Sequence, residues 1–270
     1  MIHERIFLDG SDSRVYIDTY VSDVRNFVRD AMLVIPGGGY SNVCQEREGE
    51  PIALAYLSKG YNAFVLNYRV GSEGDAYPKQ LIDAARAVLH IKRNAEKYNI
   101  NPERVFAVGF SAGGHLAGSL ALWYKHAPVL EALGVSAEEI RVKGVVLSYP
   151  VVSALYPTHE HSFANLAGMP FEEMTDGQKA KFSLETSVTE DSPAAFIWHT
   201  ATDRCVPPYG SIALATEYIK KRVPVTLRLY PYGIHGISLA NKITSRIPEA
   251  FVPTAEGWLD ESVEFLETLT

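Results

Sequence analysis

The stretch Gly109-Phe110-Ser111-Ala112-Gly113 places a serine between two glycines. Residues 104–108 before it are typical of a buried strand, and residues 112–122 after it predict a helix. Such a strand-to-helix turn, called a nucleophile elbow, strains the serine backbone and excludes bulky neighbours. It also leaves the Ala112 N–H at a helix start, where negative charge is stabilised. We therefore predict that Ser111 is a nucleophile, although a close-packing turn of small residues has the same pattern.

The length, composition and charge of the chain limit the possible fold classes and partners. Its 270 residues fit one α/β domain, and a hydrophobic content of 47% is ample for a large core. A net charge of −7 and the lack of a basic cluster argue against a nucleic-acid partner. No stretch approaches the roughly 20 apolar residues of a membrane helix, and residues 1–9 do not resemble a secretory signal. We expect a cytoplasmic protein without a membrane partner.

Two cysteines, Cys44 and Cys205, make no disulfide framework. Each follows a segment that we assign to the active site below, so both are expected near its rim. A reactive thiol is one interpretation, and an ordinary free cysteine is the favoured one.

Strand-like and helix-like segments alternate, which indicates a mostly parallel sheet with helices on both faces. The expected strands cover residues 15–21, 31–35, 62–68, 104–108, 142–148, 195–199 and 225–230. The expected helices cover residues 50–59, a long segment opened by Pro78, residues 112–122 and residues 256–269. The first strand is expected at the sheet edge, where it could support a homodimer.

Residues 150–193 interrupt this alternation, because they show no strand signal and are too long for an ordinary connection. We interpret them as a small insertion that forms a partial cap over the carboxyl edge of the sheet. The whole chain, residues 1–270, is then a single domain. The aromatic and polar residues of the insertion suit a sugar ring or a phenolic acid.

A serine becomes a good nucleophile only when an imidazole takes its proton and a carboxylate orients that imidazole. His235 follows a predicted strand and lies in a turn-rich loop between Gly233 and Gly236. A flexible loop suits a proton shuttle, so His235 is our predicted base, with a surface loop histidine as the alternative. His199 lies inside a strand and fits a packed role better.

The carboxylate is expected on the loop that follows the strand at residues 195–199. Asp203 occupies that loop and is the predicted acid, with a turn-stabilising aspartate as the alternative. Glu190 and Asp191 precede the strand and would emerge at the wrong end of the sheet.

The segment Pro36-Gly37-Gly38-Gly39-Tyr40 directly follows the buried run at residues 31–35. Glycines let a backbone turn its N–H groups toward the serine without a side chain in the way. We predict that Gly38, Gly39 and Ala112 form the oxyanion hole, with the Tyr40 N–H as an alternative donor. A phosphate-binding loop is excluded because no Gly-Lys-Ser/Thr and no Gly-x-Gly-x-x-Gly follows.

Six motifs together resemble the α/β-hydrolase superfamily, and within it the carbohydrate-esterase-like branch of acetyl xylan and feruloyl esterases. They are Pro36-Gly-Gly-Gly-Tyr40, Asn67-Tyr68-Arg69, Tyr77-Pro78, Gly109-Phe-Ser-Ala-Gly-Gly-His115, Trp198-His-Thr-Ala-Thr-Asp203 and His235-Gly236. The resemblance implies an α/β-hydrolase fold, the roles assigned above and hydrolysis of short acyl esters, often acetyl groups on sugars. Relatives with His-Gly-Gly-Gly carry a histidine at the place of Pro36, which leaves open which glycine donates.

The combined prediction is a serine esterase for a small ester such as an acylated sugar, working by acyl transfer without a metal or organic cofactor. Alternatives are an amide hydrolase on the same scaffold, arylformamidase-like or a small peptidase, and a non-catalytic binding relative. His159 and His161 with Glu160 have a spacing that favours solvated cap residues over a metal site.

Overall fold

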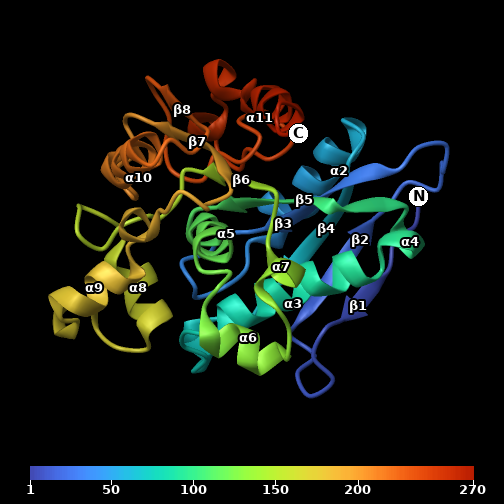
Figure 1. Ribbon diagram of the computed structural model, residues 1–270. Helices are drawn as coiled ribbons and strands as arrows, with labels where there is room; N and C mark the ends of the chain where they lie inside the picture. The colour runs from blue at the N-terminus through green and yellow to red at the C-terminus, as the bar shows by residue number, and fades with distance from the viewer.

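The computed structural model describes residues 1–270 and shows one eight-stranded sheet between helices (Figure 1). The strand order is β1-β2-β4-β3-β5-β6-β7-β8, and all pairs from β4 to β8 are parallel. The predicted mostly parallel sheet is therefore confirmed. The strands are β1 (Arg5–Phe7), β2 (Tyr16–Tyr20), β3 (Arg29–Ile35), β4 (Asn62–Asn67), β5 (Ile100–Phe110), β6 (Gly144–Ser148), β7 (Ala194–Thr200) and β8 (Val225–Tyr230).

Helices lie on both sides of this sheet (Figure 1). The α-helices are α1 (Gln45–Glu48), α2 (Glu50–Ser58), α3 (Lys79–Arg93), α4 (Ala95–Tyr98), α5 (Ala112–Leu122), α6 (Ala127–Leu133), α7 (Ala137–Ile140), α8 (Glu160–Ala167), α9 (Asp176–Phe182), α10 (Tyr209–Lys220) and α11 (Trp258–Glu267). Short 3-10 turns are η1 (Gly71–Glu73), η2 (Phe171–Glu173), η3 (Leu184–Ser187), η4 (Pro248–Ala250) and η5 (Pro253–Ala255). None of these helices combines the length and the hydropathy that a bilayer crossing requires.

Strand β3 shows why the central strands are continuous apolar runs. Its side chains alternate between two separate cores: Leu33 belongs to the one that includes residues of α3, α5 and α10, and Val34 to the one that includes residues of α2 and α11. Both faces are thus covered, as expected of a parallel sheet.

The expected edge position of residues 15–21 is wrong. Strand β2 pairs antiparallel with both β1 and β4, so β1 is the edge strand. Strand β1 has only three residues, too few to show a hydrophobic period, and this is why the sequence did not reveal it. The homodimer stays a prediction.

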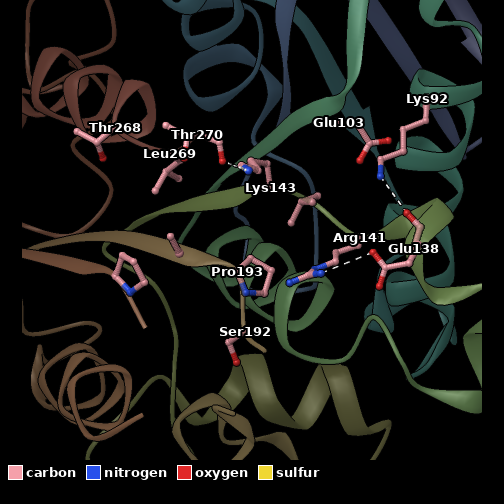
Figure 2. A pocket seen from close by; sticks show the side chains of 13 residues that line it. Lys92, Glu103, Glu138, Arg141, Lys143, Ser192, Pro193, Thr268, Leu269 and Thr270 are labelled. Carbon is pink, nitrogen blue, oxygen red and sulfur yellow. Dashed lines mark hydrogen bonds and ion pairs between the residues drawn. The ribbon is translucent and has the colours of Figure 1, made fainter. Parts of the chain in front are cut away.

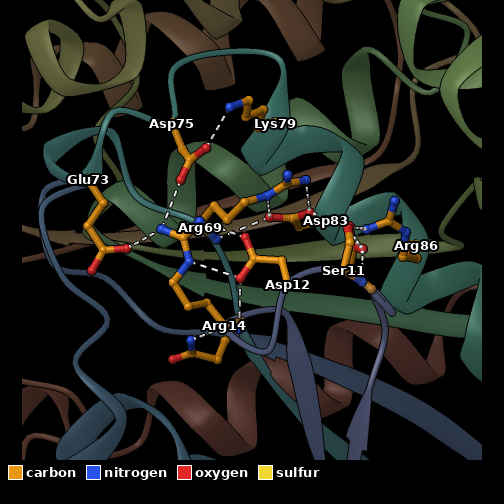
Figure 3. A network of polar contacts seen from close by, with 11 residues as sticks. Ser11, Asp12, Arg14, Arg69, Glu73, Asp75, Lys79, Asp83 and Arg86 are labelled. Carbon is orange, nitrogen blue, oxygen red and sulfur yellow. Dashed lines mark hydrogen bonds and ion pairs between the residues drawn. The ribbon is translucent and has the colours of Figure 1, made fainter.

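A polar network ties the N-terminal hairpin to the segment between β4 and α3 (Figure 3). Arg69 donates through Nε (2.9 Å) and Nη2 (2.6 Å) to the fully buried carboxylate of Asp83. Arg14, from the hairpin, lies 2.9 Å from Asp75, whose carboxylate also accepts from Lys79 at 2.6 Å. These bonds hold the segment before α3 in place.

Residues 150–193 contain helices α8 and α9 and no strand, as predicted. A cavity of about 480 Å³ lies elsewhere, among residues that precede β6, β7 and β8, such as Lys143, Pro193 and Pro224 (Figure 2). It therefore opens at the amino ends of these strands, opposite to the edge that carries Ser111.

Candidate active site

Ser111 occupies the turn between β5 and α5 with φ 53° and ψ −118°, which is a strained conformation for a residue with a side chain. Its N–H donates to Ser148 O at 3.0 Å, which fixes the turn against β6. A Cβ at Gly113 would lie 2.2 Å from Ile35 O, so only glycine lets α5 start this close to the end of β3. The strained turn that the sequence predicted is present.

The structure brings the three predicted catalytic side chains together. His235 Nε2 lies 2.8 Å from Ser111 Oγ, and His235 Nδ1 lies 2.6 Å from Asp203 Oδ2. An ionised carboxylate only accepts hydrogen bonds, so Nδ1 carries the proton of the neutral imidazole. This leaves Nε2 free to accept the hydrogen of the Ser111 hydroxyl.

Asp203 is held by more than His235. Its Oδ1 accepts the N–H groups of Cys205 (2.9 Å) and Val206 (3.0 Å), and its Oδ2 lies 3.3 Å from His199 Nε2. Burial alone would raise the pKa of Asp203, but the hydrogen bonds from His199 and His235 outweigh it and hold that pKa well below its usual range. The carboxylate is therefore ionised and oriented.

His199 is fully buried on β7, as the packed role expected for it requires. Its Nδ1 lies 2.9 Å from Ser211 Oγ and its Nε2 lies 2.8 Å from Val206 O. Because a carbonyl oxygen only accepts hydrogen bonds, Nε2 carries the proton. Its N–H points toward both Val206 O and the Asp203 carboxylate. His199 thus supports the acid, a part that the sequence did not reveal.

Two of the three predicted oxyanion donors, Gly38 and Gly39, lie in the glycine loop, which we define as residues 36–40. The Gly37 N–H donates to Glu48 Oε2 at 2.8 Å, whereas the N–H groups of Gly38 and Gly39 have no acceptor within the protein. Ala112 is the first residue of α5, and the helix leaves its N–H without an intrahelical partner. Gly38, Gly39 and Ala112 are thus available to a substrate oxygen, and Gly37 is not.

Tyr40 closes the glycine loop with its side chain buried. Its hydroxyl lies 2.9 Å from His115 Nδ1, and His115 Nε2 lies 2.8 Å from Phe182 O. Burial lowers the pKa of His115 to about 4, so the ring is neutral, with its proton on Nε2. His115 therefore links the glycine loop, α5 and the 150–193 segment.

The 150–193 segment touches the glycine loop directly. Asn165 Nδ2 donates to Gly39 O at 2.8 Å. A Cβ placed at Gly39 would lie 3.5 Å from the ring of His159. Burial first, and then His235 and His161, lower the pKa of His159. His159 is half-buried beside the site and not a solvated residue as expected, while His161 is exposed.

The remaining sequence candidates are Asp191 and the two cysteines. Asp191 is exposed and pairs with Lys125 at 3.0 Å. Cys44 is buried, with its sulfur 3.5 Å from Arg47 Nη2, so it does not line a rim. Cys205 is exposed, and partial desolvation of its thiol and the charge of Asp203 raise its pKa. No three His, Cys, Asp or Glu side chains gather as metal ligands would.

Sequence reasoning missed a buried acid beside the site. Glu48 has a side chain that is 1% exposed, yet it lies in the charged stretch Gln45–Glu48, which resembles a solvated helix. Its carboxylate accepts from Gly37 and, at 2.9 Å, from the Tyr149 hydroxyl. The Tyr149 ring lies against His235, with centroids 5.1 Å apart. No local sequence pattern predicts the bond between Glu48 and Tyr149, because these residues lie 101 positions apart in the chain.

Comparison with known proteins places the chain among hydrolases. A family model described as BD-FAE matches residues 17–218. The chain is 39% identical over 217 residues to endo-1,4-beta-xylanase B of Butyrivibrio fibrisolvens, covering 79% of this chain and 33% of that protein. It is 29% identical over 214 residues to acetylxylan esterase of Xylanibacter ruminicola, covering 76% of this chain and 40% of that protein. The chain thus spans about a third to two fifths of the length of these curated relatives.

Solved structures share the whole fold. MGS-M1, an alpha/beta hydrolase from a Medee basin deep-sea metagenome library, has a TM-score of 0.79 and 34% identity, covering 100% of this chain and 98% of that one. The acetyl ester-xyloside bifunctional hydrolase from Caldicellulosiruptor lactoaceticus has a TM-score of 0.82 and 31% identity, covering 98% and 96%. The fold is therefore the α/β-hydrolase fold.

Proposed function

We propose that this chain, which belongs to the BD-FAE family of α/β-hydrolases, cleaves short-chain carboxylic esters, and that acetyl esters of sugars are its substrates. The observation that carries the proposal is the hydrogen-bonded line from Ser111 through His235 to Asp203. The names of the relatives support the acetyl group, since one is an acetylxylan esterase and one an acetyl ester-xyloside hydrolase.

In this proposal the reaction is a two-step acyl transfer. Ser111 Oγ attacks the ester carbonyl while His235 Nε2 takes its proton, and Asp203 stabilises the imidazolium. His235 then gives that proton to the leaving alcohol, which departs and leaves an acyl-enzyme. A water molecule, deprotonated by His235, attacks the acyl-enzyme, and His235 returns that proton to Ser111 Oγ as the bond between Oγ and the acid breaks.

The tetrahedral intermediates carry their charge on the former carbonyl oxygen. The unpartnered N–H groups of Gly38, Gly39 and Ala112 are the proposed donors to it. Each donor contributes roughly 3 kcal/mol to lowering the barrier in enzymes of this kind. The N–H of Gly37 makes no such contribution, because Glu48 already accepts it.

We also propose that residues 150–193 act as the partial cap that selects the alcohol part of the substrate. The hydrogen bond from Asn165 to Gly39 O and the position of the His159 ring beside Gly39 support this role. The exposed Tyr156 belongs to the same segment and can present a ring face to a sugar.

The test compares initial rates on three substrates. Acetylated xylo-oligosaccharides and p-nitrophenyl acetate are expected to be hydrolysed, with acetate released, and Ser111→Ala is expected to lose both activities. Faster turnover of N-formylkynurenine than of either ester would instead favour the amide-hydrolase alternative. No turnover of any substrate, together with no labelling of Ser111 by a fluorophosphonate, would favour a binding protein.

A further inference from the structure

We propose that Glu48 is a positioning residue that fixes the glycine loop and the loop carrying His235 relative to each other; this inference rests on the proposed function. We call residues 231–240, which follow β8, the histidine loop. The two loops supply different parts of the reaction: one supplies oxyanion donors, and the other supplies the base. Their relative placement therefore decides whether both act on the same ester carbonyl.

One oxygen of Glu48 holds the glycine loop. Oε2 accepts the Gly37 N–H at 2.8 Å. Gly37 lies against the nucleophile, since a Cβ built on it would come within 3.0 Å of Ser111 Cβ. Fixing this amide therefore fixes the start of the loop whose next two amides are the proposed oxyanion donors.

The other oxygen of Glu48 holds the histidine loop through Tyr149. The Tyr149 hydroxyl donates to Oε1 at 2.9 Å and accepts the Ser238 N–H at 3.0 Å. The same ring packs edge-on against His235. Burial and the neighbouring Glu48 charge raise the pKa of Tyr149, so its hydroxyl stays protonated and keeps donating.

Arg47 adds a second attachment beside the first. Its Nη1 donates to Gly236 O at 2.9 Å, and its backbone O accepts from the Ser238 hydroxyl. Its Nη2 lies 3.7 Å from Glu48 Oε1, which partly compensates the buried carboxylate. Residues 47 and 48 thus hold the histidine loop at Gly236 and Ser238, directly after the base.

The choice of a charged residue here is informative. A buried carboxylate is costly unless it is paired and hydrogen-bonded, and apolar packing would stabilise a core equally well. Hydrogen bonds to an ionised acceptor are shorter and stronger than neutral ones. The carboxylate therefore supplies directional bonds to two loops at once, which apolar packing does not.

The test uses variants of the full chain with p-nitrophenyl acetate. Glu48→Ala is expected to lower kcat by about 10- to 100-fold with KM within about 3-fold, because it misplaces groups that act in the transition state. Glu48→Gln keeps an acceptor for Gly37 and should restore most of kcat. Tyr149→Phe should cost less than Glu48→Ala, and the double variant Glu48→Ala/Tyr149→Phe should cost less than the product of the two single effects.

The control is Asp30→Asn, which weakens another partly buried ion pair, Asp30–Arg104 at 2.8 Å, at the opposite end of β3. It should lower the melting temperature and leave kcat unchanged. Equal kcat in Glu48→Ala and Asp30→Asn, measured where both are folded, would overturn the proposal. If Glu48→Ala does not fold, wild-type kcat in both Glu48→Gln and Tyr149→Phe would overturn it. Failure of the proposed function itself is seen separately, as activity that persists in Ser111→Ala.

Discussion

The imidazole of His235 lies 2.6 Å from the carboxylate of Asp203, although 32 residues separate them in the chain. Asp203 follows β7 and His235 follows β8, and these two strands pair in parallel. Parallel neighbours end at the same edge, so loops that follow them meet there. The short contact is thus a product of the strand order.

Asp203→Asn is expected to lower kcat by about 10³- to 10⁴-fold, because an amide does not enforce the tautomer that leaves His235 Nε2 free. Initial rates on p-nitrophenyl acetate measure the loss. The backbone N–H groups of Cys205 and Val206 can still bond to the amide oxygen, so the loop should keep its place. A loss under tenfold would contradict the role of Asp203.

Ser111→Ala is expected to lower kcat on the order of 10⁶-fold, since the nucleophile is lost. The melting temperature should change little, because the substitution removes one hydroxyl contact and keeps a Cβ in the same strained turn. Rates on p-nitrophenyl acetate and thermal unfolding are the two measurements. Labelling by a fluorophosphonate should disappear in this variant, and persistence of either activity or labelling would show another nucleophile.

The glycine loop offers a matched pair of substitutions. At Gly37 a Cβ would lie 2.6 Å from Phe110 O, so Gly37→Ala must shift the loop, and kcat should fall by at least about 100-fold. At Gly39 the nearest atom to an added Cβ is 3.5 Å away, so there is room for a methyl group. Gly39→Ala should destabilise the protein by roughly 1–2 kcal/mol, because a side chain is strained at φ +63°. Gly39→Ala should keep kcat within tenfold. The reverse order of effects would contradict this geometry.

Stability should fall in mild acid because of His115. Its pKa is lowered to about 4 in the folded protein, so between pH 6.5 and 4 the unfolded chain binds more protons and stability rises with pH. From pH 7 to pH 5 the linked loss in free energy of unfolding is about 2 kcal/mol. Urea unfolding at both pH values should show a smaller loss in His115→Gln than in the wild type. An equal loss of stability in both proteins would show that titratable groups other than His115 cause it.

His159 should matter for the sugar and not for the chemistry. Its half-buried ring lies beside Gly39, and its lowered pKa keeps it neutral near pH 7. We expect His159→Ala to raise KM for acetylated xylo-oligosaccharides about tenfold, because one hydrogen bond to the sugar is lost. KM for p-nitrophenyl acetate should stay unchanged. His161→Ala, at an exposed position in helix α8 two residues after His159, is the control. Equal changes in KM for both substrates would show that His159 does not bind the sugar.

The sequence predicted the central strands and the elbow because both depend on local rules. A run such as residues 31–35 is apolar without interruption only when both faces of a strand are buried, and Gly113 is required wherever a helix starts this close to a strand. Strand β1 was missed because three residues carry no period. Its partner β2 was therefore assigned to the edge.

The chain by itself determined the candidate nucleophile, acid and base, because each of them follows a strand that is visible in the sequence pattern. The order of these strands along the chain indicates which loops meet at the carboxyl edge of the sheet. Only the tertiary structure decided which glycine amides are free, because the Gly37 N–H is bonded to Glu48, a residue that resembles a solvated helix position. It also decided that His199 supports Asp203 and that His159 lies beside Gly39. These contacts join side chains from separate elements, and their partners depend on how the elements pack and not on any local spacing.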